Sequence, residues 1–182
     1  MPDERDRGLI ARIAVDRDMD ALEQLYQSYR ERLGPFLFRI VRDEAANEET
    51  FNDVMMTVWQ KAGQYQGGSK VSTWIYAIAY RQCLKSLRGK RHEKNTVELP
   101  EDLTANSDGA ENRELVTRAL TGLSEDHRMA IELSYFVGCT YREIADIAGC
   151  PESTIKTRVF HARQKLKQIL SEMGSESFEE LL

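Results

Sequence analysis

The chain has 182 residues, of which 41% are hydrophobic and 30% are charged, and its formal net charge is −5. This length suits one domain of moderate size or two small ones. Apolar residues never form a run of about eighteen, the length that a membrane span needs. The charged N-terminus lacks the apolar core of a signal peptide. We therefore expect a soluble, helix-rich protein.

The cysteines and histidines are too scattered to predict a metal site. No CxxC pair occurs, and the spacings fit no zinc-finger pattern. An odd number of cysteines fits a reducing cytoplasm better than a disulfide scaffold. Because no catalytic constellation accompanies them, we expect neither a cofactor nor an enzyme, and a metal-dependent regulator is a remote alternative. The residues are Cys83, Cys139, Cys150, His92, His127 and His161.

Charge is segregated along the chain. The stretch 81–94 carries six Lys or Arg against one Glu, and 151–168 carries five against one. Between them, 95–114 holds six acidic residues against one Arg, and the last twelve residues add four acids and no base. Two basic patches around an acidic spacer indicate contact with nucleic acid at two places, although solvated helix faces would leave a similar pattern.

The first half of the chain has the apolar periodicity of helices. In 20–41 apolar residues recur at helical spacing, and we expect Pro35 to kink or restart that helix. The stretch 48–62 is more regular, with apolar residues at intervals of three and four. This stripe consists of Phe51, Val54, Met55, Val58 and Ala62.

A loop and a third helix follow. Residues 65–70, Tyr-Gln-Gly-Gly-Ser-Lys, predict a loop by their Gly-Gly-Ser content. Beyond it, apolar residues from Trp74 to Leu87 predict a helix that Ser72 or Thr73 would cap.

The stretch 95–111 is acidic, contains Pro and Gly and has little periodicity, so it predicts a flexible linker. Helical pattern resumes at Glu114 and again after Ser124. We therefore predict an all-α fold of two small helical domains joined by an acidic flexible linker. The predicted segments are a first domain at 1–92, the linker at 93–111, a second domain at 112–170 and an acidic tail at 171–182.

Residues 140–166 contain two helical patterns around a Gly-Cys-Pro corner. Gly149 suits the left-handed end of a helix over 141–148, and Pro151 suits the start of the next helix. At about 100° per residue, four apolar side chains of the second helix share its inner face. They are Ile155, Val159, Ala162 and Leu166. The opposite face carries Ser153, Thr157, Phe160, His161 and Gln164, with Lys156 and Lys167 at its edge.

This outer face suits DNA better than a protein core. A helix in the major groove needs small polar groups and an apolar contact for base edges, with Arg and Lys beside them for phosphates. A short helix, a tight turn and a second helix with such a face predict a helix-turn-helix. A plain helical hairpin is the alternative.

Two blocks of the sequence resemble one family. Residues 123–166, LSEDHRMAIELSYFVGCTYREIADIAGCPESTIKTRVFHARQKL, resemble the promoter-binding C-terminal domain of bacterial sigma factors, especially the extracytoplasmic-function (ECF) group. Residues 47–79, NEETFNDVMMTVWQKAGQYQGGSKVSTWIYAIA, resemble the conserved N-terminal domain of that group. Both blocks in this order are far more specific than a helix-turn-helix alone. The resemblance covers roughly 9–92 and 112–170.

The resemblance implies two interfaces in the N-terminal domain. One helix binds the polymerase clamp in the family, and its positions here are Glu49, Asn52, Asp53 and Gln60. The following loop and helix read the promoter's minus-ten element, and their positions are Tyr65, Ser69, Lys70, Ser72, Arg81, Lys85 and Arg88. A solvated helix face would resemble the first set, and Tyr65 suits core packing as well as base stacking. Arg81 replaces an Asn that is common in the family, which favours a phosphate contact there.

In the second domain, the resemblance implies that the outer helix face reads the minus-thirty-five element. The base-contacting positions are Lys156, Thr157, Phe160 and His161, and the phosphate-contacting positions are Thr154, Arg158 and Arg163. His161 stands where some members have Arg, so it offers no bidentate contact to guanine.

The sequence thus predicts an ECF-type sigma factor, which is not an enzyme. We expect it to direct core RNA polymerase to promoter DNA, to use no small-molecule substrate and to be restrained by an anti-sigma factor of unknown identity. Its expected location is the cytoplasm, with sequestration at the inner membrane by that anti-sigma factor as a further expectation. The alternative is a stand-alone helix-turn-helix regulator that does not bind polymerase.

Overall fold

The computed structural model describes residues 2–93 and 110–172. Within these ranges only the backbone is described at 2, 88–93, 110–114 and 117. Every regular element of the described chain is helical, as the sequence predicts. The chain divides into two compact units, one built mainly from the residues up to 93 and the other mainly from the later residues. The predicted linker and acidic tail lie almost entirely outside the described residues.

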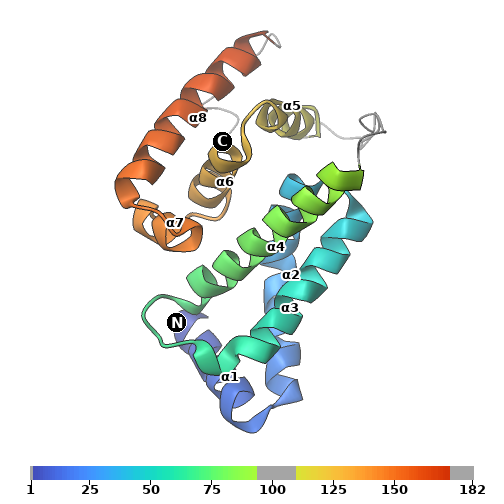
Figure 1. The fold of residues 1–182 in the computed structure, drawn as a ribbon, viewed down its shortest axis with the longest axis vertical. Coiled ribbons are helices and arrows are strands. Elements are labelled where there is room, and N and C mark those ends of the chain that lie inside the picture. Colours follow the sequence, from blue (N-terminus) through green and yellow to red (C-terminus); the bar gives the residue numbers. More distant parts are fainter. Residues whose placement is uncertain (1, 94–109, 173–182) are drawn as a thin grey trace. The chain divides into compact units, whose positions relative to one another are not determined.

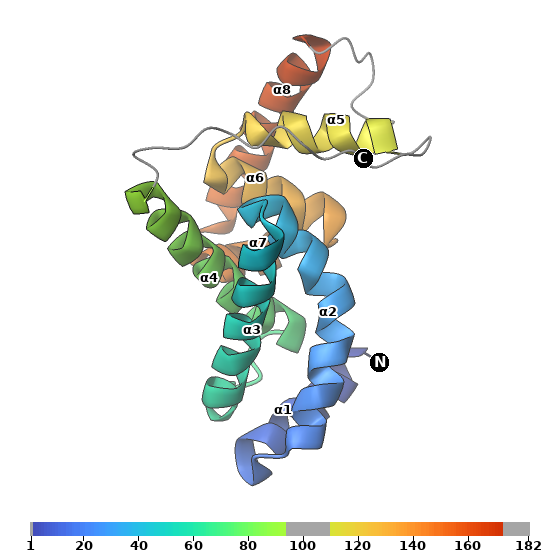
Figure 2. The same ribbon diagram turned by 90° about the vertical axis from the view of Figure 1, so that its right-hand side faces the viewer.

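The N-terminal unit is a bundle in which α2, α3 and α4 lie side by side and α1 packs against one end of the bundle (Figures 1 and 2). A short 3-10 turn, η1, follows α3, and a loop over 65–70 leads from it into α4. The elements are α1 (Pro2–Asp16), α2 (Met19–Val41), α3 (Glu44–Lys61), η1 (Ala62–Gln64) and α4 (Val71–Glu93).

The core of this unit forms where the apolar stripes of its helices meet. Leu25, Val54 and Ile75, one from each of α2, α3 and α4, are completely buried. Burying a side chain of this size stabilises a fold by about 1.5 to 3 kcal/mol. The rings of Phe36 and Tyr76 add an edge-to-face contact, with centroids 5.2 Å apart. The predicted helical stripes of 20–41 and 48–62 are therefore core stripes.

Two sharp corners connect the first three helices. Arg17 and Arg42 both adopt left-handed backbone conformations, with φ of 51° and 55°. Asp18 and Asp43 follow them, and each carboxylate accepts hydrogen bonds from backbone N–H groups in the first turn of the next helix. Because Asp43 caps α3, this helix begins at Glu44, earlier than the predicted 48.

Helix α2 continues through Pro35, so the predicted restart does not occur. Proline lacks the N–H that would bond to the carbonyl four residues earlier, which weakens a helix at this level. Here the neighbouring carbonyl of Arg32 accepts a hydrogen bond from the hydroxyl of Tyr76, at 3.2 Å. Phe36, completely buried, anchors the same turn in the core. Contacts with α4 thus support the helix where its own hydrogen bonding is incomplete.

The predicted cap of α4 is wrong. The helix begins at Val71, so Ser72 and Thr73 lie inside its first turn, and Thr73 is buried. The N–H of Val71 instead donates to Oδ1 of Asp3 in α1, at 2.8 Å. The carboxylate of Asp3, 68 positions away in the sequence, therefore caps α4 in place of the expected local hydroxyl.

The C-terminal unit contains the predicted helix-turn-helix. Its helix α5 begins at Ala110, slightly before the predicted Glu114, and a π-helical turn, η2, links α6 to the segment before α7. Gly149, with φ of 67°, ends α7 in the left-handed conformation that the sequence predicts. The elements are α5 (Ala110–Thr121), α6 (Glu125–Ile131), η2 (Glu132–Phe136), α7 (Tyr141–Ala148) and α8 (Glu152–Glu172).

Local signals set the starts of α6 and α7. The Ser124 hydroxyl accepts a hydrogen bond from the backbone N–H of His127. Thr140 and Glu143 form a capping box, in which the Thr140 N–H donates to the Glu143 carboxylate at 2.8 Å. The predicted inner stripe of α8 is confirmed, because its four members are at most 2% exposed. Its opposite face is thereby turned to solvent.

Candidate nucleic-acid interface

The outer face of α8, formed by Lys156, Thr157, Phe160 and His161, is exposed along its whole length. Phe160 leaves 57% of its surface accessible, which is unusual for an aromatic side chain in a small domain. The Thr157 hydroxyl donates to the carbonyl of Ser153, so its acceptor lone pairs still face outward. An apolar ring among hydroxyl, imidazole and ammonium groups can contact thymine methyl groups and polar base edges together.

A second histidine lies beside this face. The ring of His161 stands 5.4 Å from that of Phe160 and 6.5 Å from that of His127, which belongs to α6. The sequence does not predict His127 at this place, because its proximity depends on how α6 packs against α8.

Lys156 pairs with Glu152 at 2.9 Å, and this hydrogen bond raises the pKa of Lys156.

The three flanking residues of α8 differ in their surroundings. Arg163 is exposed, and Thr154 is half-buried. Arg158 turns inward and forms an ion pair with Asp126 of α6, with Nη2 and Oδ2 2.6 Å apart. Its side chain is only 24% exposed. The structure therefore gives Arg158 a role in tying α8 to α6, and its expected contact with phosphate stays a prediction.

The loop over 65–70 is compact. Tyr65 is half-buried, and its hydroxyl donates to the carbonyl of Ser69, which closes the loop on itself. The ring of Tyr65 lies 5.5 Å from that of Trp74. Burial raises the pKa of Tyr65 above its usual value, so the phenol stays protonated at neutral pH. Lys70 is exposed at the end of the loop. The half-buried ring of Tyr65 thus lies beside the polar backbone of a compact loop.

Helix α4, which follows the loop, carries two exposed cations. Arg81 and Lys85 are four residues apart and therefore lie on one face of the helix. Ser72 is half-buried near the helix start. The predicted position Arg88 belongs to α4, but its side chain lies outside the described residues.

Helix α3 presents a separate outer face, formed by Glu49, Asn52, Asp53, Met56 and Gln60. All five side chains are exposed, as the helical register predicts. Asn52 accepts a hydrogen bond from the hydroxyl of Tyr26, at 3.1 Å. Met56 leaves 56% of its surface accessible in the middle of the face. Two carboxylates and two amides around a flexible apolar side chain can dock a basic, partly apolar protein surface.

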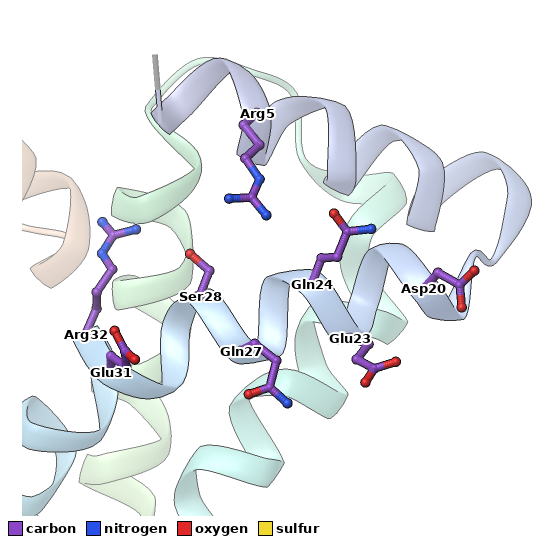
Figure 3. A pocket seen from close by; sticks show the side chains of 8 residues that line it. All are labelled: Arg5, Asp20, Glu23, Gln24, Gln27, Ser28, Glu31 and Arg32. Carbon is purple, nitrogen blue, oxygen red and sulfur yellow. The ribbon is translucent and has the colours of Figure 1, made fainter.

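A shallow polar groove lies between α1 and α2 of the N-terminal unit. Figure 3 shows Arg5 extending from α1 toward α2, above Gln24 and Ser28. Its lining mixes carboxylates, amides and guanidinium groups and includes no predicted site residue. The lining residues are Arg5, Asp20, Glu23, Gln24, Gln27, Ser28, Glu31 and Arg32.

The described part of the chain contains no cluster of three or more His, Cys, Asp or Glu arranged for a metal ion. Burial raises the pKa of the Cys83 thiol to about 12, so this thiol stays protonated and unreactive. Cys139 and Cys150 are half-buried thiols that are not joined in a disulfide. Among the described helices, none has the length and apolar character that a membrane crossing requires.

Two family models match the chain, one on each unit. Residues 25–93 match "Sigma-70 region 2", and residues 113–166 match "Sigma-70, region 4". Among curated proteins, the ECF RNA polymerase sigma factor RpoE of Cereibacter sphaeroides is 33% identical, over 94% of this chain and 100% of the relative. The ECF RNA polymerase sigma factor SigK of Mycobacterium sp. (strain JLS) is 30% identical, over 91% of each chain.

Solved structures have the same fold. The sigma factor RpoE from Bartonella quintana, crystallised with the anti-sigma factor NepR, matches with a TM-score of 0.72 and 26% identity. That match covers 82% of this chain and 96% of the other. CnrH, solved with the cytosolic domain of CnrY, matches with a TM-score of 0.73 over 92% of this chain, and at 19% identity it supports the fold alone.

Proposed function

Because the chain belongs to the ECF group of RNA polymerase sigma factors, we propose that its two units contact polymerase and the two promoter elements through the three surfaces described above. The observation that carries this proposal is the pairing of two modules in one chain. A region 2 match lies on the unit with the exposed α3 face and basic α4, and a region 4 match lies on the helix-turn-helix unit. A stand-alone regulator needs only the second module.

Helix α8 reads the minus-thirty-five element in this proposal. Its outer face enters the major groove, where Phe160 contacts apolar base edges and Thr157 and His161 form hydrogen bonds. In the free chain Lys156 pairs with Glu152. In the complex it would exchange this partner for a phosphate or a base acceptor of DNA. Arg163, which is exposed, contacts phosphate and therefore contributes affinity rather than sequence selectivity.

The loop over 65–70 and α4 open and read the minus-ten element. Tyr65 offers a ring edge to an unstacked base, and the loop backbone offers hydrogen bonds to it. Arg81 and Lys85 on α4 neutralise phosphates beside the melted segment. Both cations are exposed on the helix that follows the loop, which supports this assignment.

The outer face of α3 binds core polymerase. Asp53 and Glu49 supply negative charge, and Met56 supplies an adaptable apolar contact. The sigma factor is a non-enzymatic initiation factor, so we propose that polymerase performs all the chemistry. Acting on DNA with polymerase places the chain in the cytoplasm.

Binding at two promoter elements at once makes recognition selective. Each unit alone should bind DNA weakly and with steep salt dependence, because its contacts are mostly with phosphates. Joining the units in one chain makes the second contact intramolecular, so only promoters with the right spacing engage both. We also propose that an anti-sigma factor restrains this chain, as the Bartonella quintana sigma factor was solved with one.

Run-off transcription tests the proposal. Purified chain is added to core RNA polymerase on a library of promoters, and the transcribed promoters are sequenced. We expect transcripts only when the chain is present and only from promoters that share two elements at fixed spacing. Tight binding to one duplex site, without a polymerase complex or transcripts, would indicate a stand-alone regulator instead.

A further inference from the structure

The N-terminal end of α1 grips the loop over 65–70. Oδ1 of Asp3 accepts the N–H of Val71, the first residue of α4, at 2.8 Å. Nη2 of Arg7 donates to the carbonyl of Ser69, at 3.3 Å. Asp3 and Arg7 also bind each other, with Oδ2 and Nε 2.8 Å apart. The two side chains thus form one unit that contacts the far end of the loop.

The Asp3–Arg7 pair also reaches the middle of the loop. The Ser69 carbonyl accepts from both Arg7 and the Tyr65 hydroxyl, so the guanidinium and the phenol converge on one oxygen. A Cβ placed on Gly67 would lie 3.5 Å from Nη1 of Arg7, and Gly67 has a left-handed φ of 73°. Arg7 therefore packs against the loop backbone at a position that adopts the left-handed conformation favoured by glycine.

Asp3 and Arg7, which together we call the clamp, both carry charge. Burial acts to raise the pKa of Asp3, but the hydrogen bonds from Arg7 and the Val71 N–H outweigh it, and the pKa of Asp3 is lowered. The hydrogen bond that Arg7 donates to Asp3 raises the pKa of Arg7. Both groups are therefore ionised at neutral pH, as the Asp3–Arg7 ion pair requires.

We propose that Asp3 and Arg7 are positioning residues that hold the loop over 65–70 in the shape that discriminates minus-ten bases. The inference rests on the proposed function, because it assigns those bases to this loop. A loop that contains two adjacent glycines loses much conformational freedom when it becomes ordered. If the loop is already ordered in the free chain, this cost does not weaken DNA binding. Both residues lie outside the 25–93 segment that matches the family model, so they add to it.

The first measurement follows the loop in the free chain. Hydrogen–deuterium exchange of the Val71 amide should accelerate by about tenfold or more in Asp3→Ala, because a charged acceptor is lost. Arg12→Ala is the matched control. Arg12 is another arginine of α1 in an ion pair, but its partner is Asp18 at the start of α2. Unchanged exchange at Val71 and its neighbours in both Asp3→Ala and Arg7→Ala would overturn the clamp.

The second measurement follows selectivity in the complete system. Core polymerase with each variant transcribes a library with a fixed minus-thirty-five element and a randomised minus-ten element. Arg7→Ala should lower the preference for the best minus-ten sequence by about three- to tenfold, while polymerase binding stays unchanged. Arg7→Lys, which keeps a cation beside Asp3, should recover part of that preference, and Arg12→Ala should match the unaltered chain.

The outcomes separate the two proposals. If the unaltered chain yields no promoter-dependent transcript but the exchange of Val71 accelerates, Asp3 and Arg7 do hold the loop, but the proposed function is wrong and the role in minus-ten selectivity falls with it. If exchange accelerates while the minus-ten profile of Arg7→Ala equals that of Arg12→Ala, the clamp does not set selectivity and this inference is overturned.

Discussion

Replacing Phe160 by Ala separates base reading from simple attraction to DNA. The ring is 57% exposed, so its removal should lower the unfolding free energy of the C-terminal unit by only about 1 kcal/mol. Complete burial of a Phe side chain contributes about 1.5 to 3 kcal/mol. Burying the 57% that is exposed in the free chain would therefore contribute about 1 to 2 kcal/mol to DNA binding. This corresponds to a ratio of about 5 to 30 between preferred and non-preferred sites.

The assay measures equilibrium binding of the polymerase complex to promoters that vary at each minus-thirty-five position. Phe160→Ala should flatten the profile at one or two positions and leave the others unchanged. The matched variant is Arg163→Ala, which removes an exposed cation from the same helix. It should weaken binding to all sequences equally and lower the slope of log K against log salt by about 1.

Two results would refute this reasoning. Equal sequence profiles for Phe160→Ala and Arg163→Ala would show that the ring does not read bases. A loss of more than about 2 kcal/mol in unfolding free energy for Phe160→Ala would show that the ring packs in the core, in conflict with its exposure.

Three further predictions test the other surfaces. Asp53→Arg should abolish pull-down of core polymerase while circular dichroism and the melting temperature stay unchanged; undiminished pull-down would remove Asp53 from the docking face. Arg158→Ala should lower the unfolding free energy by about 1 kcal/mol in urea titrations, because it leaves the half-exposed Asp126 without its ion pair. The hydrogen bond from the Ala21 N–H lowers the pKa of Asp18, so its contribution to stability is present above about pH 4 and is lost as the pH falls through the lower folded pKa. Asp18→Ala should therefore flatten the loss of stability between neutral and acidic pH, and an unaltered pH profile would exclude this cap as its source.

Much of the candidate site could be predicted because it depends on helical register. The inner stripe of α8 recurs at intervals that place it on one face, and the structure buries all four members. The exposure of Phe160 and of Asp53 follows from the same geometry, since a side chain opposite a buried stripe points to solvent. Gly149 ends α7 as predicted because its left-handed conformation disfavours other residues.

Predictions failed where a distant residue supplied the partner. Ser72 and Thr73 are good local caps, but Asp3 takes their place because α1 packs beside the start of α4. The ion pair between Arg158 and Asp126 was not predicted either, because only the packing of α6 against α8 brings the two together, and the contact of Arg158 with phosphate stays a prediction. The effect of Pro35 depends similarly on contacts with α4.

The sequence by itself determined the helices, their buried faces and the order of the two modules, because apolar periodicity, caps and turn residues act over a few positions. The tertiary structure alone decided which charged groups remain available for DNA and which hold the fold. Arg163 and Arg158 have the same chemistry and lie five positions apart on one helix, but only Arg158 meets a carboxylate. Asp3 and Arg7 likewise acquire their role only when folding brings the beginning of the chain to the loop over 65–70.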